Sequence, residues 1–325
     1  MKHGANIYKY AKKLKCKDDE IIDFSSNINL YQKNDTTITR YADASYMKLK
    51  KTISKNYSIK PSQIALYNGA SAAIFELIKS LKQKRIYLYA PLYGEYEKAS
   101  NGKKIIKINR FKNLYKKPKK DSIVVFVNPS TPDAKYYDLD KLFNIWIKQN
   151  STIILDESFL EFEELKSARS MIKSYKKLYI IQSFSKFYAC AGIRIGAVFS
   201  CKKNIQKLQI PLWNLSSFDV KFLTKRLKDK GFKKKTLKLH KKRKKELYEI
   251  LKKSKKFSKI YKSDANFFLV KQKLGKNIFQ HLIKHKILVR KCDNFDYLNH
   301  QYLRFAIKNT KSHEKLKRFI FTKEF

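Results

Sequence analysis

The chain has 325 residues, of which 43% are hydrophobic and 14% aromatic, so it is long enough for one or two domains with a sizeable core and is not disordered. Its formal net charge of +47 comes from 74 basic and 27 acidic residues, and only ten of the basic residues are arginine. Because lysine is spread over nearly every segment, the charge indicates a lysine-biased composition, and we expect no specific nucleic-acid binding.

Cysteine use and hydropathy exclude further classes. The four cysteines are widely scattered, without a C-x-x-C pair or a His-Cys cluster, which argues against a disulfide framework or a metal site and favours a reducing compartment. No long uncharged apolar run is present, and the N-terminus lacks the apolar segment of a signal peptide. We therefore expect a cytoplasmic protein that does not engage a membrane.

The N-terminal part predicts an arm followed by a helix. Residues 1–35 contain a short amphipathic helical pattern near residues 7–14 and a strand-like piece that ends in polar residues. Apolar residues then recur three to four positions apart through residues 41–57, which predicts a helix there.

A glycine turn at Gly69 precedes a helix with apolar periodicity that continues to Leu77. Free backbone N–H groups near Ala70 and the hydroxyl of Ser71 would form an anion site at the start of this helix. An ordinary serine N-cap would give the same pattern, so both interpretations stay open here.

Strand-like and helical segments alternate between residues 85 and 199, and the strands are almost continuously apolar. This pattern predicts an α/β fold in which a mostly parallel sheet is covered by helices on both faces. Ligands of such sheets bind beyond the carboxyl ends of the strands. Four strand ends carry candidate site residues, at 91–93, 128–132, 156–159 and 183–196.

Asp156 ends the apolar run formed by residues 153–155, where a carboxylate is costly unless it meets a cation or a donor. It is therefore a candidate functional residue. The alternative is that its carboxylate caps a neighbouring loop.

Lys186 differs from most lysines of the chain because its neighbours are aromatic and small residues. Such a setting would disfavour the charged amine and make it a nucleophile for carbonyl chemistry. The alternative is a packed stem with its ammonium group in solvent. The convergence of the other strand ends favours the nucleophile.

The remaining third predicts one or two lysine-rich helices over residues 220–256 and then an α+β cap. We expect three parts: an arm over residues 1–35 that joins the small domain, a large domain over 36–215, and a smaller α+β domain over 216–325.

The sequence resembles, nearly end to end, the fold-type I pyridoxal-phosphate (PLP) enzymes of the class I/II aminotransferase family. The signature is Ser183-x-Ser185-Lys186 followed by Gly192-x-Arg194-x-Gly196, after Asn128-Pro129 and Asp156-Glu157. The closest likeness is the branch of histidinol-phosphate aminotransferases and threonine-phosphate decarboxylases. Segments 3–7, 23–29, 156–162 and 288–295 look like the decarboxylases, and the aminotransferases usually carry tyrosine where Phe159 stands.

The resemblance implies that PLP is the cofactor and that three residues are catalytic. Lys186 would hold PLP as a Schiff base, Asp156 would pair with the pyridinium nitrogen, and Tyr93 would stack on the ring. Further cofactor contacts are implied for Gly69, Ala70, Ser71, Asn128, Thr131, Ser183, Ser185 and Arg194.

The resemblance also implies a homodimer and a set of substrate contacts. Tyr41 would reach the cofactor of the neighbouring subunit. Arg304 would bind the substrate carboxylate as a bidentate pair, and His3, Asn6 and Asn29 would close over the substrate.

The chain departs from the family pattern at residues 130–134, Ser-Thr-Pro-Asp-Ala, where Asn-Asn-Pro-Thr-Gly is usual. Thr131 thus replaces the asparagine that donates to the ring hydroxyl, although a threonine hydroxyl can also donate. Leu30 replaces a common proline, and Ala73 stands where glutamate or a similar polar residue is common.

The activity implied is decarboxylation of L-threonine O-3-phosphate or a close O-phospho-amino acid. The alternative is a class I/II aminotransferase of the histidinol-phosphate type, and a remote one is an inactive, basic nucleic-acid-binding homologue. The bond at Cα that is held perpendicular to the cofactor ring decides between the two enzymes, and that geometry is not encoded in a motif.

Overall fold

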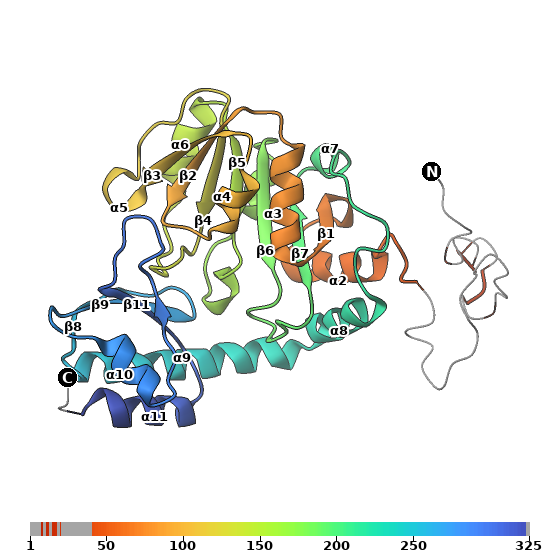
Figure 1. Cartoon of the computed structure of the whole chain (residues 1–325). Coiled ribbons are helices and arrows are strands. Elements are labelled where there is room, and N and C mark those ends of the chain that lie inside the picture. Colours follow the sequence, from red (N-terminus) through yellow and green to blue (C-terminus); the bar gives the residue numbers. More distant parts are fainter. Residues whose placement is uncertain (1–7, 9–10, 13–14, 18–19, 21–40, 323–325) are drawn as a thin grey trace.

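The computed structural model describes residues 41–322 together with residues 8, 11, 12, 15–17 and 20. Its largest element is a seven-stranded sheet with the order β1-β7-β6-β5-β4-β2-β3 (Figure 1). All strands run in the same direction except β7, which is antiparallel to both of its neighbours. The strands are β1 (Ile64–Asn68), β2 (Arg85–Ala90), β3 (Lys104–Asn109), β4 (Ile123–Val127), β5 (Thr152–Asp156), β6 (Leu178–Ser183) and β7 (Ile195–Phe199).

Helices cover both faces of this sheet, which confirms the predicted α/β fold. Successive strand residues point to opposite faces, so Ile64 and Leu66 belong to one core cluster and Ala65 and Tyr67 to the other. One face packs against α2 (Met47–Tyr57), α6 (Asp140–Lys148) and α8 (Ser217–Lys228), and the other against α3 (Gly69–Ser80), α4 (Glu95–Ala99) and α7 (Lys202–Ile205). Burial on both sides explains why the strands lack a polar alternation.

Helix α2 begins later than the periodicity predicted. Its first residue is Met47, and Tyr46 before it has a left-handed backbone with φ of 48°. Shorter turns connect the sheet elements at η2 (Pro61–Gln63), α5 (Arg110–Asn113), η3 (Leu160–Phe162) and η4 (Ala168–Ile172).

A second, antiparallel sheet with the order β10-β11-β9-β8 forms the smaller α+β unit. Its strands are β8 (Phe257–Ile260), β9 (Phe267–Gln272), β10 (Arg290–Lys291) and β11 (Tyr302–Ala306). Residues of α9 (Lys230–Lys253), α10 (Ile278–Lys284) and α11 (Thr310–Ile320) share one core cluster with this sheet.

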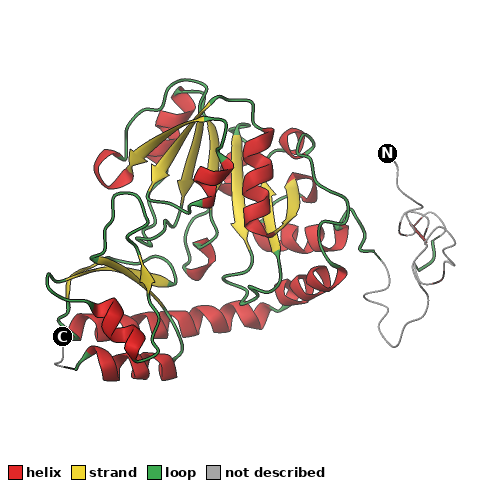
Figure 2. Ribbon diagram, in the orientation of Figure 1, coloured by secondary structure: helices red, strands yellow, loops and turns green. Residues whose placement is uncertain are grey.

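The lysine-rich stretch forms two helices, α8 and α9, that run in succession beneath both sheets (Figure 2). Asp229 separates them and caps α9 by accepting a hydrogen bond of 3.0 Å from the Phe232 N–H. Leu223 and Leu227 of α8 lie in the core of the large sheet, whereas Leu247 of α9 lies in that of the small sheet. The core of the large sheet therefore includes residues beyond 215. The predicted boundary between the large and small domains at residue 215 stays a prediction.

Ion pairs connect the two sheets' domains. Glu163 lies 2.5 Å from Lys244 Nζ and 3.5 Å from His240 Nε2, both on α9. Burial alone would raise the pKa of Glu163, but the hydrogen bonds from these two side chains outweigh it and lower the pKa to about 2. Lys107 of β3 similarly lies 2.8 Å from Asp296 of the small domain.

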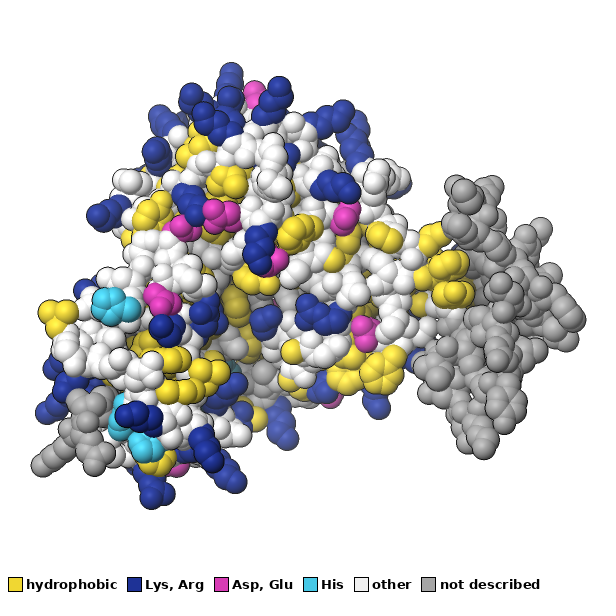
Figure 3. All heavy atoms as spheres, viewed as in Figure 1, with side chains coloured by type: hydrophobic (Ala, Val, Ile, Leu, Met, Phe, Trp, Pro, Cys, Tyr) yellow, Lys and Arg dark blue, Asp and Glu magenta, His cyan; other side chains and the backbone are white. Residues whose placement is uncertain are grey.

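Lysine and arginine side chains are distributed over the face shown in Figure 3 without gathering on one element. None of the helices in the described part of the chain is long and apolar enough to cross a membrane.

Candidate active site

Four parallel strands bring their carboxyl ends together in the large sheet. Strands β6, β5, β4 and β2 are consecutive in the sheet, and their ends carry Ser183, Asp156, Asn128 and the loop to Tyr93. The predicted convergence of these strand ends is therefore confirmed. Arg304, on β11 of the small domain, approaches the same edge and donates to Thr131 Oγ1 over 2.9 Å.

Strand β7 adds a cation to this edge because it runs against its neighbours. Its amino end, which follows Arg194, pairs with the carboxyl ends of β1 and β6: Ile195 faces Asn68, and Gly196 faces Ser183. The Gly69 N–H donates to the Arg194 carbonyl over 3.0 Å, which joins the start of α3 to the start of β7.

Two glycines permit this close approach. Gly69 has φ of +79°, and a Cβ there would lie 2.8 Å from Arg194 Nη2, so the guanidinium lies directly over a position that only glycine can occupy. A Cβ at Gly196 would collide with the backbone of Ala70. A side chain at either position would fill the space around the first turn of α3.

The first turn of α3 is a candidate anion site. The N-cap is Asn68, whose side chain makes no capping hydrogen bond, and Ser71 lies inside the helix; an ordinary serine cap is therefore the wrong interpretation. Instead, Ser71 Oγ lies 3.3 Å from the Tyr93 hydroxyl. Ser183 Oγ and Ser185 Oγ lie 2.9 Å apart on the lysine loop, so hydroxyls, helix N–H groups and the Arg194 guanidinium are available to one phosphate.

Asp156 is a buried carboxylate, 5% exposed, at the end of β5. Its Oδ1 accepts from the Ser158 N–H over 2.9 Å, as the loop-cap interpretation predicted, and its Oδ2 accepts from the Tyr96 hydroxyl over 2.8 Å. Burial raises the pKa of Asp156, while these hydrogen bonds and the charge of Lys186 oppose the rise. The sequence analysis missed Tyr96, whose place in an apolar helix pattern gave no functional signal.

Lys186 faces outward from a loop whose aromatic residues face the core. Phe184, Phe187 and Tyr188 are buried, whereas the lysine side chain is exposed in the open site and its Nζ lies 3.2 Å from Ser185 Oγ. The ammonium does reach solvent, as the alternative interpretation held. Even so, desolvation by the surrounding protein lowers the pKa of Lys186. The positive charges of Arg194 and Arg304 lower this pKa further, whereas the negative charge of Asp156 opposes the shift.

Thr131 and Asn128 differ in what they offer a ligand. Thr131 Oγ1 accepts from Arg304, which leaves its hydroxyl hydrogen free to donate. The Asn128 side chain donates to the Tyr137 carbonyl over 3.0 Å and accepts from the Tyr137 N–H over 2.8 Å. Asn128 thus shapes the loop after β4, and its direct contact with a cofactor stays a prediction.

The roles predicted for Tyr41 and for the residues of the arm stay predictions. Tyr41 is 59% exposed and stacks on Trp213 with ring centroids 4.4 Å apart. His3, Asn6 and Asn29 lie outside the described residues, so their proximity to the site stays a prediction.

A profile of the family "Aminotransferase class I and II" matches residues 1–321. The chain belongs to this family. Its members depend on PLP, and the sites described above are where the resemblance placed that cofactor.

The relatives of this family member carry three kinds of name. The bifunctional adenosylcobalamin biosynthesis protein CobDQ of Leptospira interrogans is 31% identical over 97% of this chain, which spans 40% of that longer protein. The threonine-phosphate decarboxylase of Salmonella typhimurium is 24% identical, with 97% of this chain and 94% of that protein covered. The histidinol-phosphate aminotransferase structure from Clostridium acetobutylicum is 30% identical with a TM-score of 0.80, covering 87% of this chain and 90% of the other.

The residues present fit PLP. The space that glycine leaves open at the start of α3 is bordered by Arg194 and hydroxyls, which suits a phosphate dianion. Asp156 is a buried acceptor that suits a protonated ring nitrogen, and Lys186 is an amine on the neighbouring strand end whose proton is held less tightly than usual.

Proposed function

We propose that this family member decarboxylates L-threonine O-3-phosphate or a close O-phospho-amino acid. The observation that carries the proposal is the setting of Phe159, which packs edge-on against Phe267 with centroids 5.1 Å apart. Phe267 in turn lies 4.7 Å beneath the Arg304 guanidinium. The surface beside the expected carboxylate partner is therefore an apolar ring without the hydroxyl that aminotransferases of this branch usually carry there.

Bound PLP supplies a carbonyl carbon for the substrate amine and a ring that withdraws electrons from Cα. The Asp156 carboxylate would keep the ring nitrogen protonated. Thr131 would donate its hydroxyl hydrogen to the ring oxygen while it holds Arg304. After CO₂ leaves, Lys186 in its ammonium form would donate a proton to Cα and become the neutral amine, and its lowered pKa favours release of that proton.

Arg304 would bind the leaving carboxylate. Its guanidinium is fixed from two sides, by the hydrogen bond to Thr131 and by the face of Phe267. Loss of CO₂ is favoured when the carboxylate leaves a charged partner for an apolar surrounding, and the partly exposed ring of Phe159 would provide that surrounding.

An aminotransferase of the histidinol-phosphate type is the second candidate. The likeness to the Clostridium acetobutylicum structure supports it, because that protein is matched over nearly its whole length. In that reaction Lys186 would remove the hydrogen from Cα, and Arg304 would hold the carboxylate of the amino donor or acceptor.

The deciding experiment follows the carboxyl carbon. PLP-loaded protein is incubated with L-threonine O-3-phosphate labelled in the carboxyl group, without a keto-acid acceptor, and released CO₂ and the phosphorylated amine are counted. In parallel, histidinol phosphate and 2-oxoglutarate are supplied, and glutamate is measured. Lys186→Ala serves as the blank for both reactions.

We expect CO₂ and phosphorylated amine in equal amounts and no glutamate. Glutamate formation without CO₂ would replace the decarboxylase with the aminotransferase. Neither product, from protein that binds PLP, would show that the substrate class is wrong.

We further propose that the protein acts as a homodimer. Exposed apolar side chains lie near the Tyr41–Trp213 stack in the sequence: Leu212, next to Trp213, is 53% exposed, and Phe218, five residues after Trp213, is 61% exposed. An isolated protein rarely leaves such large apolar side chains together in water. Sedimentation should give a dimer, and Trp213→Glu should shift the protein toward monomer; a monomeric wild type would refute the proposal.

A further inference from the structure

We propose that the buried pair Arg110–Asp133 positions Thr131, and through it Arg304, for recognition of a substrate carboxylate. This inference rests on the proposed function only in taking Arg304 as the carboxylate partner. Neither member of the pair touches the expected reacting atoms, so both would be positioning residues.

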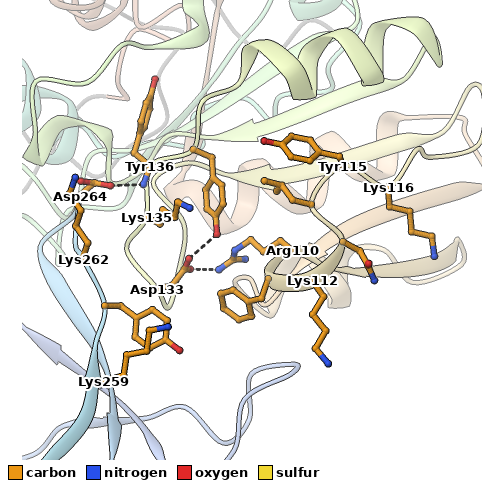
Figure 4. Close-up of a pocket in the computed structure, with 15 residues that line it drawn as sticks. Arg110, Lys112, Tyr115, Lys116, Asp133, Lys135, Tyr136, Lys259, Lys262 and Asp264 are labelled. Atoms are coloured by element: carbon orange, nitrogen blue, oxygen red, sulfur yellow. Dashed lines mark hydrogen bonds and ion pairs between the residues drawn. The ribbon is translucent and has the colours of Figure 1, made fainter.

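Arg110 is the hub of a buried hydrogen-bond network at the end of β3. The side chain is 1% exposed and forms an ion pair with Asp133, which is 3% exposed (Figure 4). It also donates to three backbone carbonyls: those of Tyr89 at 3.2 Å, Thr131 at 3.1 Å and Pro91. One side chain thus joins the ends of β2 and β4.

The two segments that Arg110 joins are those expected to hold the cofactor ring. Pro91 lies two residues before Tyr93, and the Thr131 carbonyl belongs to the residue whose hydroxyl accepts from Arg304. A shift of the Arg110 guanidinium would therefore move the backbone of Thr131. The Arg304 fork would lose the partner that sets its orientation.

Asp133 completes the network from the other side. Besides Arg110, it accepts from Ser130 Oγ at 2.7 Å and from the Tyr137 hydroxyl at 3.1 Å. The same loop is tied to the small domain, because Asp264 accepts from the Tyr136 N–H at 2.9 Å. Both oxygens of the Asp133 carboxylate therefore accept hydrogen bonds, which helps a buried charge to be tolerated.

Two features of the sequence indicate that the pair has a specific use. Arginine is rare here, with ten in 325 residues, and only its planar fork can reach carbonyls of both segments and a carboxylate together. Asp133 stands where the family usually has threonine. The negative charge that pairs with Arg110 therefore lies in the same segment, residues 130–134, in which Thr131 also differs from the family pattern.

The test compares two probes that cannot react. One is 3-(phosphonooxy)butanoate, which is threonine phosphate without its amine, and the other is isopropyl phosphate, which also lacks the carboxylate. Their affinities for the PLP-loaded protein are measured by calorimetry. Melting temperature and PLP affinity are recorded for every variant.

The main variant is the double change Arg110→Met/Asp133→Asn, because removing Arg110 alone would leave a buried carboxylate without its cation. We expect the carboxylate probe to bind about tenfold more weakly, from the loss of one oriented, charge-assisted hydrogen bond, with isopropyl phosphate unchanged. Thr131→Val should give the same loss, and combining all three changes should add nothing to it.

The matched control is Lys107→Met/Asp296→Asn, which removes an ion pair between β3, the strand before Arg110, and the small domain, without contact to Thr131 or Arg304. It should leave both probe affinities unchanged. A folded double variant that binds the carboxylate probe normally would overturn the inference, and so would equal weakening of both probes. If the protein does not release CO₂ but the double variant still binds the carboxylate probe more weakly, the proposed reaction is wrong and the inference about the pair holds.

Discussion

The lysines of the Lys186 loop and of helix α9 lie in opposite surroundings, apolar in the loop and solvated on the helix. Half of the 24 residues of α9 are lysine or arginine, and most of them lie on the solvent side of the helix. Between Ser183 and Cys190, by contrast, Lys186 is the one charged residue, and its neighbours are buried aromatic rings. The pKa of Lys186 is lowered by the surrounding protein.

The difference shows that the setting of a charge decides its chemistry. On α9 most ammonium groups are hydrated and can be exchanged for another polar group at little cost, Lys244 with its partner Glu163 being an exception. At the strand ends, an amine beside a buried carboxylate and two guanidinium groups is held where its proton can be lost. A net charge of +47 therefore says little about function, whereas one lysine in an apolar loop says a great deal.

The largest expected effect follows from Lys186→Ala. The variant should fold, because its side chain is exposed and makes a single hydrogen bond. Activity should fall by more than about a thousandfold, since the group that exchanges the proton is gone. The visible absorbance of protein-bound PLP should disappear as well, and retention of that band would remove Lys186 from the site.

Asp156→Asn should have the second-largest effect. Losing a charge aimed at the cofactor ring is expected to lower kcat by about a hundredfold. Tyr96→Phe, which removes only the hydroxyl that donates to Asp156 Oδ2, is the graded control and should lower kcat less. Steady-state kinetics on both variants would contradict the assignment if Tyr96→Phe proved the more harmful.

Glu163→Gln tests how much the ion pair between Glu163 and Lys244 of α9 stabilises the fold. The folded pKa of Glu163, about 2, lies below its ordinary 4.5, so the pair stabilises the fold above pH 4.5 and loses that contribution as pH falls toward 2. We expect a loss of about 1–2 kcal/mol at pH 7, reduced by solvent screening, and little difference from wild type near pH 2. Urea unfolding at both pH values measures this, and a loss independent of pH would refute the ion-pair origin.

Lys238→Gln should have the smallest effect. This exposed residue of α9 should change the free energy of unfolding by less than about 0.5 kcal/mol and leave PLP binding unaltered. A clear loss of activity in Lys238→Gln would mean that the lysines of α9 do more than keep the surface charged.

Much of the site could be predicted because its signals are local. The apolar run of residues 153–155 that Asp156 ends forms β5 (Thr152–Asp156), since apolar residues followed by a carboxylate mark both the strand and its end. The serines, the lysine and the arginine of the 183–196 stretch are likewise adjacent in the chain. Such patterns depend only on residue type and order.

Contacts between distant segments could not be predicted. Tyr96 is 60 residues from the Asp156 carboxylate that it contacts, and Arg110 is 23 residues from Asp133. The commitment of Asn128 to the Tyr137 backbone also required the folded loop. In each case the partner is chosen by the packing of the sheet and its loops, which a linear pattern does not contain.

The sequence by itself determined the α/β class and the strand ends, because these follow from local composition and periodicity, and its short motifs supplied the candidate amine, carboxylate and guanidinium groups through the family resemblance. Only the tertiary structure decided that β7 runs antiparallel and so brings Arg194 over Gly69 at the start of α3. It also decided that Arg304 meets Thr131 across two domains. The direction of a strand and the contact between domains depend on residues that are far apart in the sequence. Among the possible strand arrangements, the one that buries both faces of the sheet is favoured.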